Sequence, residues 1–325
     1  MANRYGCLAL LLSTIAGACG GDEGQSARAE PLIRTADPYA RGYHDADFPR
    51  VQELAPGVYS YEQLRSAGEE KFTTVSLFVV TRDGVLVADG QGSVEETTRL
   101  LEHISAITDE PIRTVVVASD HGDHTAGNSA FPEDAAFLAH PNSAAALERS
   151  AANRREGAPP VRLATELVSD SKVIQMGDRE IHVLFLGRAH TGGDLVVYLP
   201  KEKIMFMSEA YLHRVFPAMR TAFPSEWVEM IEAAQAMDVN VYVPGHGFVD
   251  PPSILEEELE TYQDALRTVI AEARRLHEAG YGLDEAKELA VFGNLENWTL
   301  RSSQGARSIQ QVYAEINGEL PEARR

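Results

Sequence analysis

The chain has 325 residues, enough for one large domain or two modest ones. Its 44% hydrophobic and 24% charged residues are ordinary for a globular protein with a sizeable core. The net charge of −20 gives a surface that repels phosphate backbones, so the composition argues against a nucleic-acid partner.

Residues 1–19 have the features of a secretory signal, with Arg4 before an apolar run and small residues leading to Cys19. The ending "IAGAC" resembles a bacterial lipoprotein signal, in which a lipid on Cys19 would be the only membrane contact. We expect an exported, periplasmic protein; plain export and an unremoved anchor are the alternatives. Residues 20–50 form a polar tether and irregular lead-in. Because Cys7 and Cys19 are the only cysteines, the mature domain offers no thiol for catalysis or zinc binding.

The following region begins with predicted β-structure. The sequence "FTTVSLFVVTRDGVLVADG" predicts two strands joined by a turn at "RDG". Ser93 is predicted to cap a helix over 94–107, with Glu96 completing a capping box. The further predictions, in chain order, are strands at 112–119 and 135–140, a helix at 141–152, strands at 172–176, 179–187, 194–200 and 203–207, a helix at 225–237, and a strand that runs into a loop over 239–247. This order predicts an α/β (α+β) fold with two sheets and helices outside them.

The last part of the sequence is helical in pattern. Residues 253–280 place Leu255, Leu259, Tyr262 and Leu266 at helical spacing, with charged residues elsewhere. Two shorter helices are predicted at 283–290 and 306–316. We expect residues 251–325 to pack on a main domain of residues 51–250, with their apolar faces against a sheet rather than against a cofactor.

Four histidines follow predicted strands in turns that contain glycine. They lie in "SDHGDHTAGN", "GRAHTGGD" and "PGHG", and they are His121, His124, His190 and His246. A single loop histidine says little, but four in this arrangement, two of them flanking Asp123, indicate a cation site. Imidazole and carboxylate ligands without sulfur favour zinc, with manganese or iron as alternatives.

The motifs "SDHGDHTAGN", "GRAHTGGD", "KIMFMSEA" and "VPGHG", in this order, resemble those of the metallo-β-lactamase superfamily. The resemblance covers roughly residues 50–250. It implies a four-layer αββα sandwich with a metal centre at one edge, and here a helical C-terminal extension.

Matching the motifs residue by residue implies a metal ligand set of His121, Asp123, His124, His190, Glu209 and His246. The first histidine of the family pattern HxHxDH is replaced by Ser119, so one of two metal sites lacks a ligand. The other site, Asp123, His124 and His246, is complete. Glu209 stands where many members have a bridging aspartate, and it is one methylene longer.

Three interpretations follow from these departures. One is a single metal in the complete site with activity. Another is two metals, the first held weakly by His121, His190 and either Glu209 or Asp120. The last is a site without chemistry. Asp120 is a weak candidate ligand in the two-metal interpretation, because neighbouring residues of a strand face opposite sides and its side chain is expected to point away from the site.

The resemblance implies a zinc-dependent hydrolase, with one or two ions, that acts on a small molecule. In this hypothesis a metal-bound hydroxide attacks the carbonyl of an ester, lactone, thioester or amide, and Asp123 orients the nucleophile. His213 and Phe216 are weak candidates for substrate contacts, with packing as the competing explanation. An exported binding or accessory protein that keeps the fold without turnover is one alternative function, and a β-lactamase is another.

Overall fold

Twelve strands form one hydrogen-bonded sheet in the part of the protein that the computed structural model describes, residues 32–322. The predicted signal, residues 1–19, and the first part of the predicted tether lie outside the described residues. The strands are β1 (Arg50–Ala55), β2 (Val58–Ala67), β3 (Glu70–Thr81), β4 (Gly84–Ala88), β5 (Ile112–Val117), β6 (Ala136–Ala139), β7 (Glu166–Leu167), β8 (Ser171–Met176), β9 (Arg179–Leu184), β10 (Val196–Leu199), β11 (Ile204–Leu212) and β12 (Val241–His246).

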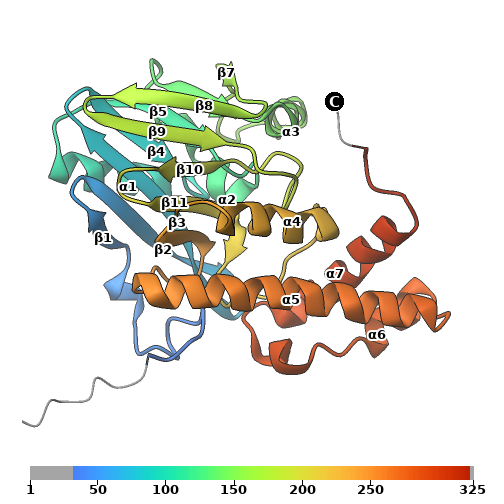
Figure 1. Ribbon diagram of the computed structural model, residues 1–325. Helices are drawn as coiled ribbons and strands as arrows, with labels where there is room; N and C mark the ends of the chain where they lie inside the picture. Colours follow the sequence, from blue (N-terminus) through green and yellow to red (C-terminus); the bar gives the residue numbers. More distant parts are fainter. Residues whose placement is uncertain (1–31, 323–325) are drawn as a thin grey trace, which may run out of the picture. The chain divides into compact units, whose positions relative to one another are not determined.

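The strand order is β7-β6-β5-β4-β3-β12-β11-β10-β9-β8, with β2 paired to β3 and β1 paired to β2. β3 and β12 share a single pair, Thr74 with His246. The two predicted sheets are therefore the halves of one continuous sheet that curls at this junction (Figure 1). The predicted hairpin is confirmed, because β3 and β4 pair antiparallel through a turn that ends at Gly84.

Alternate residues of β3 serve two different cores, as the pleat of a strand requires. Leu77 and Val79 belong to the large core that also contains Val197, Phe206 and other residues of the β8–β12 half. Phe78 belongs to a smaller core beneath two outer helices. The sheet is thus covered on both faces, which explains its long apolar runs.

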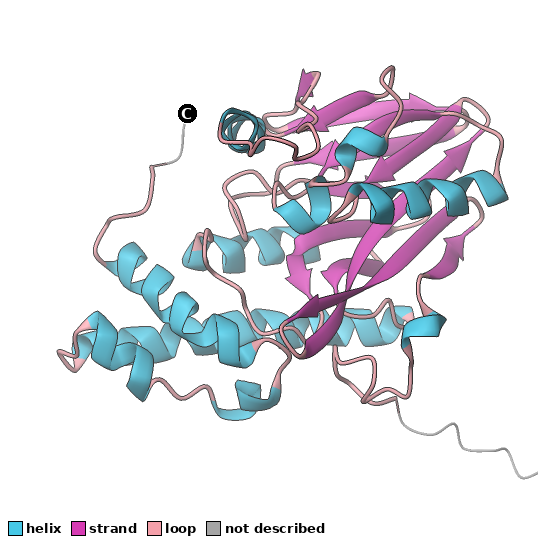
Figure 2. Ribbon diagram, turned by 180° about the vertical axis from the view of Figure 1, so that it is seen from behind, coloured by secondary structure: helices cyan, strands magenta, loops and turns pink. Residues whose placement is uncertain are grey.

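The helices among the described residues are α1 (Val94–Ile107), α2 (Gly122–Thr125), α3 (Pro141–Ala152), α4 (Pro224–Gln235), α5 (Pro252–Glu278), α6 (Leu283–Leu289) and α7 (Arg301–Ile316). Figure 2 shows α1 lying across the strands on one side, and Figure 1 shows α4 and α5 on the other. The smaller core includes Leu100 of α1 and Leu147 of α3. The predicted sandwich of helices and strands is confirmed.

Helix α1 begins as expected, because the Ser93 hydroxyl accepts a hydrogen bond from the Glu96 amide. The second half of the predicted capping box is wrong. The Glu96 carboxylate accepts instead from the Arg65 guanidinium at 2.9 Å, because a charged partner is a stronger donor than a backbone amide.

The helical C-terminal part packs on the sheet through a continuous apolar face. Leu255, Leu259, Tyr262 and Leu266 of α5 are fully buried in the large core. Helix α7 contributes Ile309 and Val312 to the same core. Among the described residues, none of the helices combines the length and apolar character needed to cross a membrane.

Candidate metal centre

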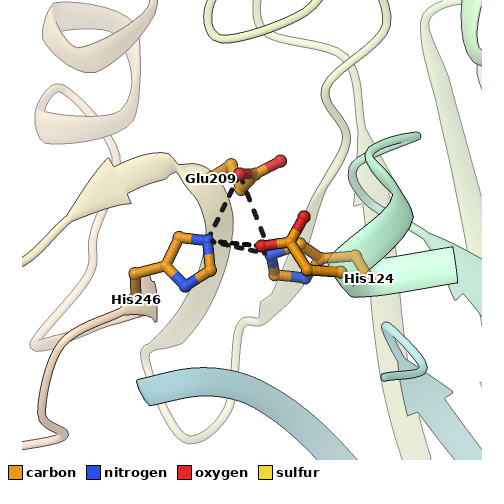
Figure 3. A group of neighbouring side chains, drawn as sticks. His124, Glu209 and His246 are labelled. Carbon is orange, nitrogen blue, oxygen red and sulfur yellow. Dashed lines mark hydrogen bonds and ion pairs between the residues drawn. The ribbon is translucent and has the colours of Figure 1, made fainter. Parts of the chain in front are cut away.

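Polar side chains from four separate segments meet where β12 touches β3. The segment after β5 brings His121, Asp123 and His124, the loop after β9 brings His190, β11 carries Glu209, and His246 ends β12. We call these six side chains the donor floor. Figure 3 shows the side chains of His124, Glu209 and His246 pointing towards one another.

Irregular backbone geometry accompanies Glu209 on β11. The pairing of β11 with β12 shifts register between Phe206 and Ser208, and Ser208 has a φ of 47°. Such irregularities re-aim the side chains beside them. Gly245 of β12 lies so close to Ser208 that an added Cβ would be 2.3 Å from its carbonyl carbon. The glycine of "PGHG" therefore allows the two strands to approach beside the donor floor.

One group of donors consists of Asp123, His124, Glu209 and His246. The His246 Nε2 atom lies 3.4 Å from His124 Nε2, 3.3 Å from Asp123 Oδ2 and 3.3 Å from Glu209 Oε1. Ligand atoms of a tetrahedral zinc ion, each about 2.0–2.1 Å from the metal, are about 3.3 Å apart. The spacing and the donor types therefore fit a zinc ion.

The other group consists of His121, His190 and Glu209. His121 Nδ1 is 3.0 Å from Glu209 Oε2, His190 Nε2 is 3.1 Å from Glu209 Oε1, and the two histidine nitrogens are 3.0 Å apart. These three donors also fit a metal ion, with one coordination position left for another ligand. Glu209 belongs to both groups, with both of its oxygens engaged.

Ser119, at the position of the missing histidine, contacts Glu209 directly. Its hydroxyl donates a hydrogen bond of 2.5 Å to Glu209 Oε2, and the serine is fully buried. The longer glutamate thus reaches the space beside the small serine.

Three of the four imidazoles of the donor floor are oriented by contacts on their far sides. His246 Nδ1 lies 2.8 Å from the Thr73 carbonyl oxygen, and His121 Nε2 lies 2.9 Å from the Thr221 hydroxyl. His124 Nδ1 faces Asp89 Oδ2 at 3.1 Å. Such outer contacts fix which ring nitrogen is free to bind a metal. Here they leave Nε2 of His124 and His246, and Nδ1 of His121, pointing inward.

The donor floor is strongly polarised. Burial opposes protonation of His121 and His246, but nearby carboxylates outweigh it and raise their pKa values to about 9 and about 10. Burial and Glu209 would raise the pKa of Asp123, but His246 and His124 lower it below its ordinary value. The acids are therefore ionised and these two imidazoles hold protons in the metal-free protein. A cation would replace those protons.

The sequence model of the metallo-β-lactamase superfamily matches residues 70–246, more than half of the chain. The chain belongs to this superfamily. Membership suggests a metal-dependent hydrolase, and the donor groups described above could hold its metal ions.

Similar proteins of the superfamily are distant in sequence. The chain is 25% identical over 215 residues to the 2,4-dinitroanisole O-demethylase subunit alpha of Nocardioides sp. strain JS1661, covering 64% of this chain and 62% of that protein. It therefore spans about three fifths of that relative. It is 21% identical to a metallo-β-lactamase type 2 of Bacillus cereus, covering 65% of this chain and 81% of that one.

A solved metallo-β-lactamase from Pontibacter korlensis has the same fold, with a TM-score of 0.58 at 21% identity. The match covers 67% of this chain and 98% of that one. The β-lactamase is nearly fully covered, whereas a third of the present chain has no counterpart in it. The comparison therefore establishes the superfamily fold.

The structure shows where the residues predicted from the sequence to form the site lie. All six predicted ligands lie in the donor floor, although coordination itself stays a prediction. Asp120 belongs to neither donor group and lines a separate cavity with Asn142 and Arg149; it lies beyond the end of β5 at Val117, in the turn that follows the strand. Burial raises the pKa of Asp120.

His213 and Phe216 do not line the cavity next to the donor floor. His213 is fully buried, with Nδ1 2.8 Å from the Phe248 carbonyl oxygen. Phe216 is also fully buried and packs edge-on against Phe292 at 5.0 Å between ring centroids. Packing, the competing explanation, accounts for both positions.

Sequence reasoning did not identify the residues around the donor floor. For Asp89 the sequence contains an indication of a role at the site, because Asp89 directly follows an apolar strand, as the predicted ligands do. Thr221 had none. Arg220 and Arg307, which line the cavity of about 180 Å³ in front of the donor floor, had none either. An isolated surface arginine has no pattern that distinguishes it from other solvated residues.

Proposed function

We propose that the protein is a zinc-dependent hydrolase that cleaves an ester, lactone, thioester or amide bond in a small molecule. The observation that carries the proposal is Glu209, whose two oxygens face both histidine groups at 3.0–3.3 Å. This arrangement supports two ions held side by side. Membership of the superfamily supports the hydrolytic reaction class.

Bound zinc ions would supply polarisation of the scissile carbonyl and a lowered pKa for water. Asp123 is the donor residue with the most exposed side chain, at 28%, and it lines the cavity. Its carboxylate is therefore placed to orient the attacking water. Phe72, Leu212 and Val215 give the cavity an apolar wall that limits the access of bulk water.

The free-energy cost of burying the ionisable side chains of the donor floor disfavours the accessory-protein alternative. Burying Glu209 and His246 together has a desolvation cost, which their ion pair offsets in part and a bound cation would offset further. A β-lactamase is a second candidate function, favoured by relatives named as metallo-β-lactamases. Helix α7 contributes residues to the cavity, and it lies outside the matched residues. We therefore rank a β-lactam below a smaller acyl substrate.

The experiment combines elemental analysis with turnover of a chromogenic panel of esters, a lactone, a thioester and a cephalosporin. The hypothesis predicts two zinc equivalents and cleavage that Asp123→Asn abolishes. Asp120→Asn is the matched control, because it removes the neighbouring charge outside the donor groups. Absence of metal after purification in zinc-containing buffer, or equal loss in both variants, would contradict the proposal. Cleavage of the cephalosporin alone would select the β-lactamase.

A further inference from the structure

The cavity in front of the donor floor has three different surfaces. Its base is formed by donor residues, including His190 and Glu209. Its wall is apolar and includes Phe72, Leu212 and Leu300. Its edge carries two arginines, Arg220 and Arg307, which we call the arginine rim. A molecule in this cavity would contact the three surfaces together.

The two rim arginines come from different parts of the fold. Arg220 lies in the loop between β11 and α4, and Arg307 lies on α7. Both side chains are exposed, and among residues 32–322 neither guanidinium has a carboxylate within salt-bridge distance. Arg301, on the same helix, instead pairs with Glu296 at 2.9 Å. The rim therefore presents two positive charges to the cavity mouth without an acidic partner in that part of the chain.

These unpaired cations contrast with the charge of the molecule. The chain carries 49 acidic and 29 basic residues, and many of its other arginines are paired, such as Arg188 with Glu226 and Arg214 with Glu258. A guanidinium is suited to hold a carboxylate through two parallel hydrogen bonds. The −20 net charge disfavours polyanions over longer range, so a single negative charge fits this mouth best.

We propose that the enzyme selects substrates that carry a carboxylate at the end of a short aliphatic acyl chain. This inference rests on the proposed hydrolase function and adds the substrate class. The scissile carbonyl lies over the donor floor, the methylene groups contact the apolar wall, and the carboxylate is bound by Arg220 and Arg307. Arg220 lies within the matched residues 70–246 and Arg307 on α7 lies outside them, so this selectivity depends on the superfamily core and the C-terminal helical region together.

The test compares two esters that differ only at the distal end, mono(4-nitrophenyl) glutarate and 4-nitrophenyl pentanoate. The wild-type protein is expected to have the lower KM for the glutarate ester. An exposed ion pair contributes up to about fivefold in affinity, so Arg220→Gln and Arg307→Gln should each raise that KM by about two- to fivefold. The KM for the pentanoate ester should stay within about twofold, as should kcat for both esters.

The control is Arg99→Gln on α1, which removes the same charge at an exposed position away from the cavity. It separates a local contact from the general effect of a more negative molecule. Melting temperatures check that the exposed substitutions leave the fold intact. An equal rise of KM for both esters, or the same rise in Arg99→Gln, would overturn the proposal.

A binding measurement separates this inference from the proposed function. Calorimetric titration of the intact protein with 4-phenylbutyrate and its neutral amide needs no turnover. The carboxylate should bind more tightly than the amide, and the double variant Arg220→Gln/Arg307→Gln should remove that difference. If both esters resist cleavage but the difference is found, the hydrolase proposal fails and the anion site stands. If the two compounds bind equally, or the difference survives in the variant, the anion site fails.

Discussion

The donor floor and the arginine rim line the same cavity but are built in opposite ways. Four of the six floor side chains are buried, and His121 and His246 have hydrogen-bond partners on their far sides. Arg220 and Arg307 are exposed and have no acidic partner among the described residues. Groups that hold a metal must keep their geometry, whereas groups that select a substrate can adapt to it. The contrast predicts which variants remove chemistry and which only change selectivity.

The largest expected effect follows from Glu209→Gln. The amide offers one neutral acceptor oxygen where the carboxylate serves both histidine groups, so both ions should be held weakly. Because loss of an outer contact alone costs about 10- to 100-fold in metal affinity or activity, we expect kcat/KM to fall by more than about 100-fold. Elemental analysis and ester kinetics measure this. Glu229→Gln, an exposed position on α4, is the matched control, and retention of two metals in Glu209→Gln would contradict a shared ligand.

Metal binding should weaken as the pH falls. The pKa values of about 9 for His121 and about 10 for His246 mean that both imidazoles are protonated at neutral pH without metal. Each bound ion must displace protons, so zinc affinity rises with pH until these pKa values are reached. Displacing two protons corresponds to up to about 100-fold per pH unit. Competition with a chelator at several pH values measures the slope, and a flat profile would contradict the proton-holding floor.

Restoring the family histidine should first destabilise the protein. Ser119 is fully buried against Glu209, so Ser119→His overfills this space, at a cost of about 1–3 kcal/mol in the free energy of unfolding. Adding Glu209→Asp shortens the acid and should recover the loss while keeping two metal equivalents. Chemical denaturation with elemental analysis compares the three proteins. A single variant as stable as the wild type would show that the pair is not sterically coupled.

A smaller effect is expected from Thr221→Val, which keeps the shape of the side chain but removes its hydroxyl. His121 loses the partner that lies 2.9 Å from Nε2, so its other nitrogen is less firmly directed at Glu209. We expect about a tenfold loss in affinity for one of the two metal equivalents. Thr221→Ser should retain normal affinity. If both variants bind zinc alike, the hydroxyl contact does not position the ring.

The sequence contains strong signals for the parts of the molecule that repeat a physical pattern. The β-rich run and the turn at "RDG" predicted β3 and β4 as a hairpin, but not that Leu77 and Phe78 enter different cores. The histidines were predicted together because each follows a strand, and strand ends meet at one edge of a sheet. Asp120 was expected away from the donor groups and is found there, although it lies in the turn after β5 and not in a strand.

The remaining features depend on contacts that no local pattern encodes. The sequence presented Ser119 as a missing ligand, but only the fold brings its hydroxyl to Glu209, ninety positions away. The partner of the Glu96 carboxylate was missed because Arg65 lies on β2, far from helix α1 in the sequence. The rim was missed because Arg220 and Arg307 line one cavity only after α7 packs beside the loop that follows β11.

The smallest expected effect is that of ionic strength, which should act on the exposed arginine rim but not on the buried donor floor. Screening shortens the reach of exposed charges from about 10 Å at 0.1 M salt to about 3 Å at 1 M, but buried pairs are affected far less. The KM for mono(4-nitrophenyl) glutarate should therefore rise about two- to threefold from about 0.05 M to about 0.5 M salt. The KM for 4-nitrophenyl pentanoate and the bound zinc should not change, and the double rim variant should show no salt effect. A parallel rise for both esters would mean that salt acts on the floor or the fold, and the distinction between the two regions would fail.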